Sequence, residues 1–198
     1  MVDEKNLVAL LTTLPQKKQL AFALLIFERL LPRMTVFCED AGVDYSCCLG
    51  AQDAAWSALK TNSKRSALYR SSNQACLKNA PDTEDFTHDR TSDALNAFLT
   101  ASEIMQFALD GSFDHVAFVS TLAKDSVYLY LASLEPALVT TRQEVDRISS
   151  HPFMQQELRR QEEDIKFLTA LPGQFDEGIV SVIRARASSQ PPILPPAR

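Results

Sequence analysis

Two acidic residues lie in strongly apolar stretches of the chain and are the first candidates for chemistry. Glu28 directly follows eight consecutive apolar residues, and Asp125 interrupts a second long apolar segment. A carboxylate in apolar surroundings must be paired or must change its protonation state, and functional carboxylates are often made in this way. The alternative, which we favour, is a structural network in which Glu28 pairs with Arg29 or Lys124 and fixes the register of neighbouring helices.

A polar stripe that follows His151 is a second candidate site. Glu157, Gln161 and Asp164 follow one another at spacings of four and three, which places them on one face of a helix. Such a stripe can line a pocket, or hold a metal between bundle helices as Glu-x-x-His sets do in diiron proteins. That spacing is absent here, and the three histidines of the chain lie in separate segments, so we expect no metal site. A solvated helix face that begins at a capping His151 is the simpler interpretation.

The most polar connection of the chain, residues 80–90, gathers acidic side chains and a histidine. They are Asp82, Glu84, Asp85, His88 and Asp89. The cluster lacks the alternation and the central glycine of a calcium loop. The His-Asp pair resembles that of metal-dependent phosphohydrolases, but those enzymes need an earlier histidine ligand, which this chain does not have. We predict a turn that leads into a helix N-terminus, where acidic residues interact favourably with the helix dipole.

The four cysteines do not follow a pattern typical of a disulfide framework or a metal site. Cys38, Cys47, Cys48 and Cys76 have no CxxC spacing, and two of them are adjacent. Small buried thiols are the expected outcome. A cysteine nucleophile would need a nearby histidine, and nothing in the sequence places one there. GxGxxG, Walker, GxSxG and HExxH motifs are also missing, so we expect a protein that is not an enzyme and holds no cofactor.

The composition predicts a helical protein. Only five of the 198 residues are glycine, and the prolines fall between apolar runs. The 20 basic and 25 acidic side chains give a net charge of −5 without a concentrated basic patch, so we expect no nucleic-acid partner. A signal peptide or membrane anchor would need a basic segment before a long apolar one, and neither is found. We therefore expect a cytoplasmic protein that does not bind a membrane.

Prolines and glycines divide the sequence into about eight predicted helices. The first is short and extends from an Asp3 cap to Leu14. Pro15 and Pro32 each open a further helix, because the missing N–H of proline is tolerated in the first turn. Gly42 suits the left-handed position that follows a helix end.

Two segments, Leu20–Leu31 and Phe113–Leu134, are apolar on most sides and are the predicted core helices. Another predicted helix, which ends at about Lys60, carries Leu49, Trp56 and Leu59 on one face.

The predicted fold class is all-α, a single-domain helical bundle of residues 1–186. Thr141 and Glu144 form a capping box that opens one of the later helices. Residues 187–198 hold four of the ten prolines, and we expect a flexible Pro-rich tail there.

Several segments together resemble a known protein family. They lie at residues 14–32, 80–86, 91–98, 123–131 and 151–161, in that order. They are similar to the YjaG-like family of bacterial proteins of unknown function, over residues 5 to 171. The resemblance implies an all-helical intracellular fold without an established activity, and genome context in that family suggests a link with histidine-kinase signalling. The polar residues at the matching positions are the candidate site: Glu28, Asp82, Glu84, Asp125, Ser126, His151 and Glu157.

Two functions of different class follow as hypotheses. The favoured one is a non-enzymatic cytoplasmic binding or adaptor protein in signalling, whose unidentified protein partner docks on an exposed helical groove. The alternative is an enzyme or a small-ligand or metal-binding protein, whose polar pocket is built from Glu28, Asp125, His151 and Glu157. Either a monomer or a homodimer fits the sequence.

Overall fold

The helices of the computed structural model follow the punctuation of the sequence closely. The model describes residues 4–61, 65–86, 88, 90–134 and 142–194, and only the backbone of residues 4, 5 and 142–145. Its helices are α1 Glu4–Thr12, α2 Gln16–Ala41, α3 Ser46–Lys60, α4 Ser66–Asn79, α5 Thr91–Asp110, α6 Phe113–Leu134, α7 Arg142–Ser150, α8 Pro152–Ala170 and α9 Glu177–Ser189. No strand occurs in these ranges, so the predicted all-α class is confirmed.

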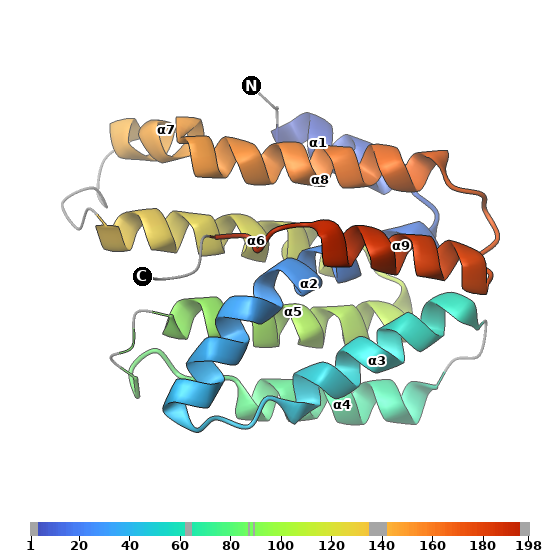
Figure 1. Ribbon diagram of the computed structural model, residues 1–198, viewed down its shortest axis with the longest axis horizontal. Helices are drawn as coiled ribbons and strands as arrows, with labels where there is room; N and C mark the ends of the chain where they lie inside the picture. Colours follow the sequence, from blue (N-terminus) through green and yellow to red (C-terminus); the bar gives the residue numbers. More distant parts are fainter. Residues whose placement is uncertain (1–3, 62–64, 87, 89, 135–141, 195–198) are drawn as a thin grey trace.

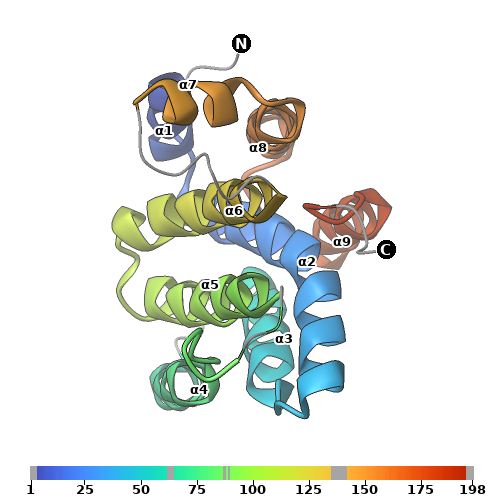
Figure 2. The same cartoon turned by 90° about the vertical axis from the view of Figure 1, so that its left-hand side faces the viewer.

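The helices form layers around α2 (Figures 1 and 2). Helices α1, α7 and α8 lie on one outer side, α4 lies on the other, and α2 contacts α5, α6, α8, α3 and α9 between them. The apolar run in the first half of α2 is buried on every side, including Phe22, Leu25 and Phe27. Its prediction as a core helix is therefore confirmed.

Pro32 does not open a new helix, in contrast to the prediction. It lies inside α2, which continues to Ala41 and ends at Gly42 with a left-handed φ of 69°. A proline inside a helix cannot donate to the carbonyl four residues earlier, and it bends the helix. Figure 2 shows α2 changing direction along its length. Near this bend the carbonyl of Arg29 accepts a hydrogen bond at 3.1 Å from the backbone N–H of Ile193.

The second predicted core helix, α6, is buried on one face only. Val119, Ala123 and Val127 are buried, whereas Phe118 and Leu129 on the same helix are exposed. On α3, Trp56 and Leu59 are buried, whereas Leu49, predicted to share their helix face, is 40% exposed. None of the helices in the described part of the chain has the length and apolarity needed to cross a bilayer.

The end of the chain differs from the expected flexible tail. Helix α9 continues to Ser189, and Ile193 and Leu194 beyond it are buried. The carbonyl of Pro192 accepts a hydrogen bond at 3.1 Å from the guanidinium of Arg160. The prolines predicted a flexible segment, but the apolar side chains of Ile193 and Leu194 dock this segment beside the bend of α2. Residues 195–198, the Asp3 cap and the Thr141–Glu144 capping box lie outside the described residues or side chains.

Candidate functional site

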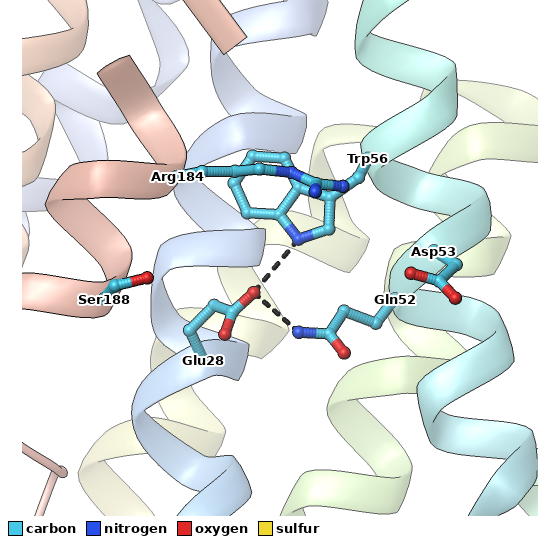
Figure 3. A pocket seen from close by; sticks show the side chains of 6 residues that line it. All are labelled: Glu28, Gln52, Asp53, Trp56, Arg184 and Ser188. Carbon is cyan, nitrogen blue, oxygen red and sulfur yellow. Dashed lines mark hydrogen bonds between the residues drawn. The ribbon is translucent and has the colours of Figure 1, made fainter. Parts of the chain in front are cut away.

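Glu28 lies at an open pocket between α2, α3 and α9 (Figure 3). The pocket has a volume of about 180 Å³. Its lining residues are Glu28, Gln52, Asp53, Trp56, Arg184 and Ser188. All six offer a polar atom, so the pocket is polar although the helices that form it bury apolar faces behind it.

The carboxylate of Glu28 is held by two neutral donors. Its Oε1 accepts hydrogen bonds from the indole Nε1 of Trp56 at 3.0 Å and from the amide Nε2 of Gln52 at 2.6 Å (Figure 3). The predicted pairing of Glu28 with Arg29 or Lys124 is therefore not the observed one. The second oxygen of Glu28 has no hydrogen-bond partner among the described residues. That oxygen remains available to a bound molecule.

Arg184 brings a positive charge to the same pocket. Its guanidinium carbon lies 4.9 Å from the centre of the Trp56 ring, which is cation–π geometry (Figure 3). Trp56 is only 2% exposed, whereas Arg184 and Asp53 are exposed to solvent. The rigid indole thus orients an acidic group with its N–H and a basic group with its face.

A second polar group lies in the interior, around Arg29, the residue that follows Glu28 in α2. Arg29 binds Asp164 at 2.6 Å and Glu157 at 3.0 Å, and the three side chains are at most 1% exposed. The predicted stripe of α8 is therefore not a solvated face but faces inward. Burial alone would lower the pKa of Arg29, but Glu157 and Asp164 together raise it above its ordinary value. The guanidinium stays charged.

Further polar side chains complete this interior network. Asp164 Oδ1 accepts hydrogen bonds at 2.7 Å from Arg186 and from Gln190, so α9 and its end are tied to α8. Gln161 donates to Glu157 at 3.0 Å and accepts from Ser120 of α6 at 2.6 Å. We infer a structural role, because these groups bond mainly to one another across four helices, and only Arg29 Nε and Glu157 Oε2 among the atoms of this network are buried without a hydrogen-bond partner.

The two candidate residues of α6 are Ser126, which is buried, and Asp125, which faces solvent. Ser126 is buried, accepts a hydrogen bond from Asn96 at 2.9 Å and donates to the carbonyl of Leu122 at 3.1 Å. Asp125 is exposed instead of lying in the core. Partial desolvation raises the pKa of Asp125, and the adjacent Lys124 acts in the opposite direction.

The loop and capping candidates have local roles. His151 begins α8, and its Nδ1 accepts a hydrogen bond from the N–H of Phe153 at 3.2 Å, which confirms the capping interpretation. Asp82 accepts from the N–H of Glu84 at 2.9 Å in the predicted turn, and both side chains are exposed.

The four residues of the predicted polar pocket do not converge. Glu28 contacts α3, Glu157 contacts Arg29, His151 caps its own helix and Asp125 faces solvent. Of these four residues, Glu28 lines the pocket between α2, α3 and α9.

Comparison with known families shows which family this chain belongs to. The sequence profile of the family described as "Protein of unknown function (DUF416)" matches residues 6–190. The chain belongs to this DUF416 family. Comparison with curated proteins finds no match.

A solved structure has a similar fold. The crystal structure of a DUF416 family protein from Shewanella baltica OS155 matches with a TM-score of 0.80 and 18% sequence identity. The match covers 91% of this DUF416 chain and 92% of that chain. At this identity the similarity shows the fold alone.

Most of the pocket of this DUF416 protein was not predicted from its sequence. Glu28 could be singled out as an acid beside an apolar run, and Trp56 was predicted to share a helix face with Leu49 and Leu59. Nothing in the neighbouring sequence marks Gln52, Asp53 or Arg184 as a pocket residue, because solvated helix faces carry the same residue types. Only the packing of α9 against α3 brings Arg184 to Trp56.

Proposed function

We propose that this DUF416 protein is a non-enzymatic binding protein, whose pocket between α2, α3 and α9 takes a small zwitterionic molecule. The observation that carries the proposal is the arrangement around Trp56. One carboxylate oxygen of Glu28 is fixed by two donors while the other is unpartnered, and the cation of Arg184 lies over the same ring. An amine would bind Glu28 and Asp53, and an anionic oxygen would bind Arg184.

The size of the pocket limits the ligand. A pocket of about 180 Å³ is smaller than the roughly 300–1,000 Å³ of sites that take drug-sized ligands. A small amino acid or aminoalkyl acid fits this volume. Larger groups would extend into solvent, since the pocket is open on one side.

The adaptor function has less support. Exposed large apolar side chains of the described residues lie on six different helices and do not mark one groove: Val8, Val36, Leu49, Leu68, Leu77, Phe118, Leu129, Leu134 and Val182. A protein partner, a signalling role and membership of the YjaG-like group within DUF416 stay proposals. We also propose a cytoplasmic location, because four free thiols suit a reducing compartment.

The single tryptophan makes the proposed function directly testable. Trp56 is the only tryptophan of the chain, so intrinsic fluorescence reports on the pocket itself. We expect a saturable change with a subset of small amino acids, and recovery of the ligand unchanged after incubation. Glu28→Gln removes the negative charge with little change in shape and should weaken binding more than about tenfold, as loss of a charge-assisted hydrogen bond does.

A matched control separates the pocket from general charge effects. Glu162→Gln removes a carboxylate of α8 that pairs with Lys166 at 2.7 Å, away from the pocket. This variant should bind as the wild type does. Absence of a saturable change across amino acids, amines and carboxylates would overturn the proposal, as would equal weakening in both variants.

A further inference from the structure

Three of the four cysteines converge at one end of the α3–α4 pair. Cys47 and Cys48 lie in the first turn of α3, and Cys76 lies in the last turn of α4. Their three Sγ atoms all lie within 4.8 Å of one another. Cys48 and Cys76 are fully buried and Cys47 is half-buried, so the group has one side near solvent. The sequence predicted small buried thiols but not this convergence.

The surroundings of Cys47 favour a thiolate. The first turn of a helix carries a partial positive charge, which stabilises a negative sulfur. The side-chain amide of Asn79 donates to Cys47 Sγ at 3.8 Å. The Sγ atoms of Cys48 and Cys76 both lie within 4.8 Å of the same sulfur.

The other two thiols lie in the interior. Cys48 and Cys76 are both 0% exposed. A cation that replaces the thiol protons would have three sulfur ligands on one centre.

The ligand set selects the class of metal ion. Thiolates prefer soft cations such as Cu(I) and Zn(II). Structural zinc almost always has four ligands. In the described part of the chain no histidine, carboxylate or fourth cysteine joins the group, and Cys38 lies outside it. Three sulfurs without a fourth protein ligand suit Cu(I) better than zinc.

We propose that Cys47, Cys48 and Cys76 form a Cu(I)-binding site. Binding forms three copper–sulfur bonds and releases the protons of Cys48 and Cys76 to solvent, with no change in oxidation state. The site is separate from the Glu28 pocket, which contains no cysteine.

The test is a Cu(I) titration of the full chain under anaerobic, reducing conditions against a chromophoric Cu(I) chelator. We expect one Cu(I) per chain and a thiolate-to-copper charge-transfer band in the ultraviolet. Cys47→Ser should lose the band and weaken binding more than about tenfold, since even outer-shell changes weaken metal sites by about 10–100-fold. Cys47 is the variant of choice because it is only half-buried.

Cys38→Ser is the matched control. Cys38 is buried but lies outside the group, so this variant should retain the band and the affinity of the wild type. Equal loss in both variants would overturn the site. A parallel Zn(II) titration tests the metal: one tightly bound zinc together with no retained Cu(I) would overturn the copper assignment. Circular dichroism of each variant verifies the fold, and an unfolded Cys47→Ser is replaced by Cys76→Ser.

Discussion

At the scale of single residues, Arg29 is the side chain on which the interior depends most. Among the described residues it is the largest fully buried side chain, and it binds two carboxylates of α8 that are 128 and 135 positions away in the sequence. Replacement of one partner of such a group leaves the others buried without compensation, which costs about 3–5 kcal/mol. Glu157 would lose its cationic partner, whereas Asp164 would keep only its pair with Arg186.

The first prediction follows from this loss. Arg29→Met keeps the volume but removes the charge, and should lower the free energy of unfolding in urea by about 3–5 kcal/mol. The control is Glu162→Gln, which breaks the partly exposed pair with Lys166 and should cost about 0–1 kcal/mol. Equal costs for the two variants would show that Arg29 is not a central stabilising residue.

At the scale of elements, the turn between α5 and α6 carries a charge-dependent clamp. His115 of α6 binds Glu103 of α5 at 2.6 Å and Asp110 at 3.1 Å. Burial alone would lower the pKa of His115, but the two carboxylates raise it above its ordinary value. A raised folded-state pKa means that the stabilising contribution is complete below the unfolded value of about 6.5 and is lost as the pH rises through the folded value.

The second prediction concerns the pH dependence of stability. The wild type should lose part of its free energy of unfolding as the pH rises above about 6.5, by a modest amount because the ring is partly exposed. His115→Gln should lack this decrease. The difference between the two unfolding curves at each pH is the measurement, and a constant difference over this range would contradict the clamp.

The position and burial of a helix could be predicted where a local sequence pattern determines them. They could not be predicted where packing against residues distant in the sequence determines them. The apolar run before Glu28 predicted a core helix because no face of it is polar. Pro32 is tolerated inside α2 because the end of the chain covers the bend through Ile193, which no local pattern reveals. The spacing of Glu157, Gln161 and Asp164 predicted one face, but a solvated and a buried face have the same spacing. The stripe faces inward because Glu157 and Asp164 bind the buried Arg29.

At the scale of the whole molecule, the end of the chain stabilises the bundle. Ile193 and Leu194 are 5% and 1% exposed and lie beyond α9, beside the bend of α2. The same region holds α9, which supplies Arg184 to the pocket and Arg186 to the interior network. Stability and the pocket therefore depend on one docked element.

The third prediction tests this coupling. Leu194→Ala should cost about 2–5 kcal/mol in the free energy of unfolding, because it removes buried apolar surface and leaves a cavity. Val182→Ala on the exposed side of α9, where Val182 is 47% exposed, should change it by less than about 0.5 kcal/mol. A small effect of Leu194→Ala would indicate that the end of the chain is not part of the core.

The central claim is that the pocket beside Trp56 binds a small zwitterion. The most direct measurement is the NMR signal of the Trp56 indole N–H, which is a single resonance because the chain has one tryptophan and which donates to Glu28. The account predicts a saturable shift of this resonance with a small amino acid in the wild type, weakened in Glu28→Gln and Arg184→Gln but kept in Glu162→Gln. An unchanged resonance across the amino acids, or the same affinity in every variant, would contradict it.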